Sequence, residues 1–401
     1  MNRTTLALLF ASALTVSPLV SAPAAAALPP EVKAAYQEYR RLLPRGKSME
    51  LGKAAFDAWQ AAEDTLGDSK TTGDLAINYA RHRMPARYGD YRSIEEAFER
   101  AIELAVLHVD NAAEMVAQRW IDYAAFKTSQ VDTRRQGTGN RTSAQRPGVR
   151  GRVTLRKAES RLRELGFANS TFMAEILTLK AERAHAMSRY DDAAESADQA
   201  IQLFKNAEIR IPSIYPLAAL TLKARSLRDS ERPVDALLVY QELTDMVDET
   251  TLSHSSYGLA VSDQFGLQED VREKGLAAQA EAKGYRFVTG RDFEPRSMSK
   301  DVEPIYRVPP DMPDRARRSG WVRLKFDVDP DGRPINVKVD ESSESLFEAA
   351  AKGSVARWIY ATGARAEPRR GVQTMISFNL YSSNGNLLPP KKPKAPIQAQ
   401  P

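Results

Sequence analysis

The sequence of 401 residues contains no cysteine. This absence excludes a disulfide framework, a thiol nucleophile, a metal site built on thiolates and a lipid anchor on cysteine. The missing cysteines do not by themselves assign the chain to an oxidising or a reducing compartment.

Residues that carry catalysis or bind metals are also scarce. The four histidines are scattered, and no two have the helical spacing of a zinc site: His82, His108, His185 and His254. The sequence has no Gly-rich dinucleotide pattern after a strand and no phosphate loop. Asp327, Asp329 and Asp331 alternate like a calcium loop, but the other ligands and the closing Glu are missing. We therefore predict no catalytic residue, no metal and no cofactor.

Long hydrophobic runs are lacking beyond the N-terminal region. Met1-Asn2-Arg3 is a positively charged start, and the apolar run from Leu6 to Val20 has about the length of a secretory signal. Small residues follow, so cleavage is expected after Ala26 or Ala27. The run is shorter than the roughly 20 residues that a membrane-spanning helix needs. We predict a signal peptide over 1–27, and an uncleaved inner-membrane anchor is the alternative.

The charge is ordinary in amount and uneven in distribution. Charged residues make up 27% and hydrophobic residues 42% of the chain, which is typical of folded soluble domains. Residues 295–401 carry 18 Lys and Arg against 12 Asp and Glu, a balance of +6 within a total of +5. Basic residues are not interleaved with stacking aromatic residues on one face, so nucleic acid is not an expected partner.

Residues 28–284 have the periodicity of amphipathic helices separated by short turns. The pattern repeats, because Phe56 and Phe98 lie 42 positions apart and Ala193 and Ala236 lie 43 apart. Small Ala residues at such positions let paired helices approach closely. The segment resembles degenerate tetratricopeptide (TPR) repeats, and an irregular helical bundle is the alternative. Stacked helix pairs would offer a concave surface to a partner.

Three segments lack the composition of packed elements. Residues 133–152 hold six Arg and four Gly with no acidic residue, so we predict a disordered basic loop. Residues 285–303, where the helical period ends, are predicted to form a linker. Residues 382–401 are rich in Pro and Lys and are predicted to form a disordered tail.

Residues 304–381 have the pattern of a small α+β domain. Val322, Leu324, Phe326 and Val328 alternate with polar residues, as in a strand with one buried face. Asp329-Pro330-Asp331-Gly332 then forms a turn, and the alternation resumes, which predicts a β-hairpin. Ser343 is placed to cap a following helix. The stretch from Gly371 to Leu380 predicts a last strand.

This domain resembles the TonB C-terminal domain family. The resemblance rests on spaced residues over about the last quarter of the chain: Pro310, Met312, Pro313, Ala316, Gly320, Val322, Asp329, Asp331, Gly332, Ser342, Ser343, Ala349, Ala350, Arg357, Trp358 and Phe378. It implies a periplasmic domain that grips a short extended segment of an outer-membrane transporter. The sequence departs from the energy-transducing members, because a helical region occupies the place of their Pro-rich spacer and no histidine precedes His82.

The resemblance implies that the last strand is the binding edge. An edge strand has unpaired backbone donors and acceptors, which an added partner strand satisfies. We predict that Gln373, Met375, Ser377 and Asn379 point away from the core beside the partner. Arg369 and Arg370 are expected to steer an acidic partner. Pairing of this edge with a second copy in a homodimer is the alternative partner.

Together these features predict a periplasmic interaction protein that is not an enzyme. It would bind outer-membrane or periplasmic proteins through strand addition and a helical repeat surface, in association with transport across the outer membrane. The alternatives are an energy transducer that keeps its leader as an anchor and a cell-wall protein with an activity that the sequence does not reveal.

Overall fold

The computed structural model describes residues 28–45, 49–83, 91–133, 147–207, 214–246, 254–293, 304–363, 367–381 and 388–389. The expected leader, 1–27, lies outside these residues. The chain divides into two compact units, Met1–Arg232 and Pro233–Pro401. In the described ranges, no helix combines the length and the apolar composition that crossing a membrane requires.

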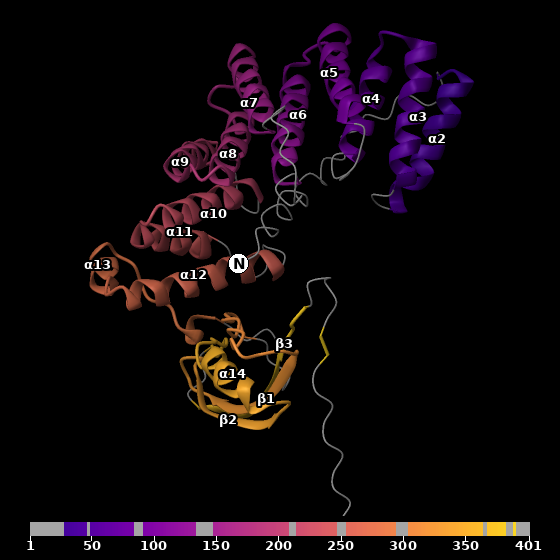
Figure 1. Cartoon of the computed structure of the whole chain (residues 1–401). Coiled ribbons are helices and arrows are strands. Elements are labelled where there is room, and N and C mark those ends of the chain that lie inside the picture. The colour runs from indigo at the N-terminus through magenta and orange to yellow at the C-terminus, as the bar shows by residue number, and fades with distance from the viewer. Residues whose placement is uncertain are drawn as a thin grey trace, which may run out of the picture. The chain divides into compact units, whose positions relative to one another are not determined.

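The first unit is entirely helical in its described part. Its elements are α2 (Pro30–Leu42), η2 (Leu43–Arg45), α3 (Met49–Leu66), α4 (Lys70–Arg83), α5 (Tyr91–His108), α6 (Ala113–Thr133), α7 (Pro147–Glu164), α8 (Thr171–Ala186), α9 (Tyr190–Asn206) and α10 (Ile214–Asp229). Each helix packs mainly against its neighbours in the chain, and the helices stand side by side in a row (Figure 1). This arrangement confirms the predicted helical region and is that of a repeat-like array.

Small residues and rings fill the spaces between these helices. Ala58, Ala97 and Ala101 are fully buried and allow close packing of the helices that carry them. Phe98 stacks on Tyr123 with ring centroids 5.4 Å apart. Several buried charges are paired, as in the contact of 2.6 Å between Arg119 and Asp74. Burial lowers the pKa of Arg119 although the Asp74 carboxylate opposes that shift.

The second unit begins with helices and ends with the sheet. Its elements are α11 (Pro233–Met246), α12 (His254–Glu273), α13 (Ala277–Ala282), η3 (Gly290–Asp292), β1 (Gly320–Val328), β2 (Pro334–Ser342), η4 (Ser345–Phe347), α14 (Glu348–Val355) and β3 (Arg369–Phe378). The antiparallel sheet has the order β2-β1-β3, with β1 in the middle. The helical array followed by a small α+β domain confirms the predicted fold class.

One face of the sheet is buried under α14 and η4. Val322, Leu324, Phe326 and Val328 of β1 are at most 1% exposed, as their alternation predicts. They share a core with Phe347 and Val355 of the covering helices and with Val372, Ile376 and Phe378 of β3.

Part of the predicted linker is packed against the sheet domain. Gly290 donates its N–H to the Asp331 carbonyl oxygen at 2.8 Å and accepts from the N–H of Thr362 at 2.8 Å. Phe293 joins Phe265 of α12 and Ile359 in one apolar cluster. We call this contact between α12, residues 285–293 and the sheet domain the platform (Figure 1). The rest of the predicted linker, 294–303, lies outside the described residues.

Two local predictions differ from the structure. Helix α7 begins at Pro147, inside the segment 133–152 that was predicted to be a loop. Pro is tolerated in the first turn of a helix, and Gly151 is buried where a Cβ would meet the Lys127 carbonyl oxygen at 3.2 Å. Ser343 does not cap α14, because its hydroxyl accepts the N–H of Trp321 at 2.9 Å instead. Residues 134–146 of the predicted loop lie outside the described residues.

Candidate partner-binding edge of the sheet

Strand β3 lies at the edge of the sheet. Its register with β1 runs without a shift from Gly320↔Phe378 to Phe326↔Val372. Among the described residues, no strand of the sheet lies on its other side. Alternate backbone N–H and C=O groups of an edge strand point away from the paired neighbour, so β3 offers a regular row of donors and acceptors.

The side chains of β3 separate into a buried and an exposed set. Val372, Ile376 and Phe378 lie in the core. The four residues expected beside a partner are exposed: Gln373, Met375, Ser377 and Asn379. Met375 stands out because 58% of this apolar residue is accessible to solvent. An incoming strand would therefore meet polar side chains with one apolar contact near the middle.

Basic residues flank this exposed set. Arg369, at the start of β3, is half-buried opposite Val328, and Arg370 is exposed. In β1, Lys325 lies opposite Gln373. Arg323 lies opposite Met375 and forms an ion pair of 2.9 Å with Glu341. The positive charges favour a partner segment with acidic residues.

The other edge strand, β2, is irregular. Its register with β1 shifts twice, between Arg323 and Leu324 and again between Lys325 and Asp327. Asn336 has a φ of 56°, which is rare outside glycine, and Pro334 has no N–H to offer. Bulges and proline are devices that keep an edge from pairing with another chain. The two edges of the sheet therefore differ in their capacity to accept a strand.

Asp327 accepts hydrogen bonds from both neighbouring strands at the points where their registers shift. Its carboxylate accepts the side-chain amide of Asn336 in β2 at 3.1 Å and the backbone N–H of Gly371 in β3 at 2.9 Å. These hydrogen bonds hold the pKa of Asp327 below its usual value, and the bond from Asn336 has the larger effect. In the sequence, Asp327 is recognised only as part of an alternating acidic run. Its role cannot be predicted there, because the bulges that it contacts depend on pairing between strands that are distant in sequence.

The glycines that carry the family resemblance sit where a side chain has no room. A Cβ on Gly320 would fall against the ring of Phe347, which packs at a tilt against Phe378 with centroids 4.7 Å apart. Gly332 has a φ of 86° in the hairpin turn and passes close to the carbonyl of Tyr360.

The other residues behind the resemblance have structural contacts. Val322 is fully buried in β1. The Asp329 carboxylate accepts the Arg333 N–H at 2.8 Å, and Trp358 donates its indole N–H to the Val308 carbonyl at 3.1 Å. Asp331 pairs with Arg291 at 2.8 Å, Ser342 donates to Glu348 at 2.6 Å, and the Pro313 carbonyl accepts from Ala316 at 2.9 Å.

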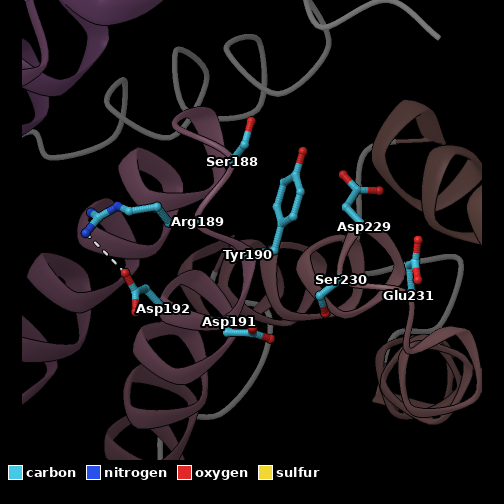
Figure 2. Close-up of a pocket in the computed structure, with 8 residues that line it drawn as sticks. All are labelled: Ser188, Arg189, Tyr190, Asp191, Asp192, Asp229, Ser230 and Glu231. Carbon is cyan, nitrogen blue, oxygen red and sulfur yellow. Dashed lines mark ion pairs between the residues drawn. The ribbon is translucent and has the colours of Figure 1, made fainter.

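A shallow cavity of about 470 Å³ lies in the helical unit. It is lined by two inter-helix turns and the residues beside them: Ser188, Arg189, Tyr190, Asp191, Asp192, Asp229, Ser230 and Glu231 (Figure 2). Ser188 and Glu231 lie 43 positions apart and have similar φ values of 60° and 62°. The two turns therefore repeat the same backbone conformation at this position.

The carboxylates of this cavity are partly neutralised. Asp192 pairs with Arg189 at 3.1 Å, and Asp229 pairs with Arg228 at 2.9 Å. His185 lies between Ser226 at 3.1 Å and Asp229 at 3.7 Å, which resembles the order of a catalytic triad. Ser226 is fully buried, however, so its hydroxyl has no access to a substrate. Within the described residues, no group of three or more His, Asp or Glu is arranged to hold a metal ion.

Comparison with known proteins bears on the sheet domain. Residues 308–380 match the family model described as Gram-negative bacterial TonB protein C-terminal. The chain is 41% identical over 80 residues to the TonB protein of Klebsiella pneumoniae, covering 19% of this chain and 32% of that protein. It is 34% identical over 94 residues to the TonB protein of Escherichia coli strain K12, covering 23% of this chain and 36% of that protein. The matches thus span about a third of the length of these relatives.

One solved structure overlaps the chain more widely and more loosely. It is that of BtubC (BKLC) from P. vanneervenii, with a TM-score of 0.42 and 12% identity over 67% of this chain and 95% of that one. At this level the likeness supports no conclusion about fold or function.

Proposed function

Because residues 308–380 form a TonB C-terminal domain, we propose that this chain holds an outer-membrane protein by adding one of its extended segments to the edge of β3. The observation that carries the proposal is the open β3 edge, which is regular from Val372 to Phe378, opposite the β2 edge with its two register shifts. Backbone pairing supplies the affinity, and the side chains beside the edge select the segment. In this proposal the chain is a binding protein and not an enzyme, and its role is in transport across the outer membrane.

The side chains around β3 suggest the composition of the partner segment. Met375 offers an apolar contact, whereas Arg369 and Arg370 favour carboxylates near the start of the strand. We expect a segment of roughly six residues that alternates, with an apolar residue beside Met375 and an acidic residue beside Arg370. The helical array supplies a second surface for an envelope partner.

The proposal places the mature chain in the periplasm, after cleavage of the leader over 1–27. N-terminal sequencing of protein recovered from the cell envelope tests this placement. A start near Leu28 supports the periplasmic adaptor, whereas a retained leader favours the anchored transducer.

The absence of cysteine makes a direct test of the edge simple, because each introduced thiol is unique. We would place single cysteines at Gln373 and Ser377 on β3 and, as a matched control, at Lys338 on β2. All three residues are exposed. A short thiol-directed photo-crosslinker on each variant would be activated in intact envelopes, and the captured proteins identified by mass spectrometry.

Crosslinks to an outer-membrane protein from Gln373→Cys and Ser377→Cys, with little from Lys338→Cys, support the proposal. Equal capture from the two edges contradicts it, as does the absence of any outer-membrane protein among the products. Products that contain only this chain assign β3 to a homodimer and also contradict it.

A further inference from the structure

Helix α7 has a strongly basic exposed face. Between Gly151 and Glu164 the helix carries two acidic and five basic residues, and all five basic residues are exposed: Arg152, Arg156, Lys157, Arg161 and Arg163. Because 295–401 carry +6 of the total of +5, residues 1–294 sum to −1. The positive charge of α7 is therefore a local feature and does not follow from the composition of the helical unit.

The packing of α7 turns this face to solvent. The helix packs against α6 and α8 (Figure 1). With about 3.6 residues per turn, the exposed residues occupy one half of the helix, whereas Leu155, Ala158 and Leu162 lie buried on the other half. Gly151 lets α7 approach α6 closely, because a Cβ there would meet the Lys127 carbonyl oxygen at 3.2 Å. The basic side chains thus project from a helix that is fixed by its neighbours.

Three of the basic side chains are not neutralised. Among the residues that the structure describes, none forms an ion pair with Arg152, Arg156 or Lys157. Arg152 and Arg156 lie four positions apart, where like charges on a helix repel each other. Burial lowers the pKa of the nearby Arg183, and the charges of Arg189 and Arg152 lower it further. An anion beside this face would relieve the repulsion.

The two acidic residues of this part of α7 offset only some of its charge. Glu164 pairs with Arg161 at 2.6 Å, and Glu159 pairs with Arg163 at 2.9 Å. Lys180 of α8 also pairs with Glu159, at 3.3 Å, so this carboxylate has two basic partners. Lys180 therefore extends the positive face onto the neighbouring helix.

The face lacks the apolar centre of a protein interface. Val153 is the one large apolar side chain that is exposed among the described side chains of α7, and 45% of it is accessible. Stable protein interfaces are usually centred on buried aromatic or large apolar anchors. A membrane surface needs no such anchor, because each basic residue gains from the field of many phosphates. Charges spread over half a helix also suit a plane of phosphates better than a single anion.

We propose that the exposed face of α7, centred on Arg152, Arg156 and Lys157, binds an anionic lipid surface. The helix axis lies along the surface, and the long basic side chains extend to the headgroups while the opposite half of α7 stays packed on α6 and α8. This inference goes beyond the proposed function, because it lies in the helical unit and uses no residue of the β3 edge.

The test is co-sedimentation of the full chain with vesicles of phosphatidylcholine alone or with about a third phosphatidylglycerol. One variant carries R152Q, R156Q and K157Q and loses the three unpaired charges. A second carries R152K and R156K, which keeps the charge but removes the guanidinium groups. Gln and Lys are about as good helix formers as Arg, so α7 should persist in both variants.

A matched control variant carries K33Q, R40Q and R92Q. It removes the same charge from exposed positions of α2 and α5. All variants share one N-terminal region, so differences between them report the exchanged charges. Thermal unfolding shows whether each variant is folded.

We expect the native chain to favour anionic vesicles and to lose that preference near 1 M salt, where the Debye length is about 3 Å. Each basic residue near the surface is worth about fivefold in binding, so the variant with three glutamines in α7 should bind roughly 100-fold more weakly. The control variant and the variant with R152K and R156K should bind like the native chain.

Equal binding to neutral and anionic vesicles overturns the proposal, and so does an equal loss in the control variant. A loss of binding with R152K and R156K also overturns it, because that result indicates a shaped anion site instead of a charged surface. Binding to poly-glutamate with none to anionic vesicles overturns it in favour of an acidic protein. The outcome is independent of strand addition, since crosslinking from Gln373→Cys should persist in the α7 variants.

Discussion

At the residue scale, Gly320 is a position where a single methyl group should disturb the domain. A Cβ there would meet the ring of Phe347, which has no room to move because it is only 1% exposed. We expect Gly320→Ala to lower the free energy of unfolding of the sheet domain by about 1–3 kcal/mol, the usual cost of overpacking.

Gly353 provides the matched control for this substitution. It lies in α14, and a Cβ added to it would have no neighbour within 4 Å. Because Ala is the better helix former, Gly353→Ala should leave stability unchanged or raise it by up to about 1 kcal/mol. Urea unfolding of both variants measures the difference, and equal losses would show that the packing at Gly320 is not the cause.

Asp327 should contribute stability that depends on pH. Its folded-state pKa lies below the usual value because Asn336 and the Gly371 N–H stabilise the carboxylate. A depressed pKa stabilises the fold above the ordinary pKa near 4, and the contribution disappears as pH falls through the lower folded-state value. The melting temperature of Asp327→Asn should therefore lie below that of the native chain at pH 7. The difference between the two melting temperatures should disappear as the pH falls below about 4. A difference that is constant with pH would contradict this role of the charge.

At the element scale, the platform should join α12 and the sheet domain in one unfolding unit. Phe265 is 1% exposed and contacts Phe293 with ring centroids 5.4 Å apart. We expect Phe293→Ala to cost about 3–5 kcal/mol and to weaken hydrogen-exchange protection in both α12 and residues 359–363. Arg286→Ala serves as the control, because the Arg286 side chain is exposed and lies outside the apolar cluster. Loss of protection on one side only would show that the two parts unfold separately.

The sequence predicts the hairpin well and the platform poorly for a physical reason. The alternation of Val322, Leu324 and Phe326 and the turn after Asp329 are local signals, which do not depend on distant residues. The segment 285–293 lacks the helical period that would signal a packed element, and its role depends on Gly290 approaching Tyr360 in space. The role of Asp327 also depends on a contact between segments that are distant in sequence.

At the scale of the whole molecule, the two units have separate cores. Asp74 pairs with the buried Arg119 in the first unit, and Phe326 is buried in the second. Asp74→Ala should cost about 3–5 kcal/mol in the first unit, because it leaves a buried charge without its partner. Phe326→Ala should cost about 3–5 kcal/mol in the second. Hydrogen exchange read by mass spectrometry should show each loss in its own unit, and a loss that spreads to both units would contradict independent folding.

The contrast between the β2 and β3 edges also sets how many strands the domain accepts. A sheet with two usable edges can add copies of itself without limit, and the product is a fibre. Here the bulges and Pro334 protect one edge, so in the proposed function the domain adds one strand at β3 and none at β2. Such a domain can end a growing sheet but cannot extend it, so an open β3 edge does not lead to a fibre.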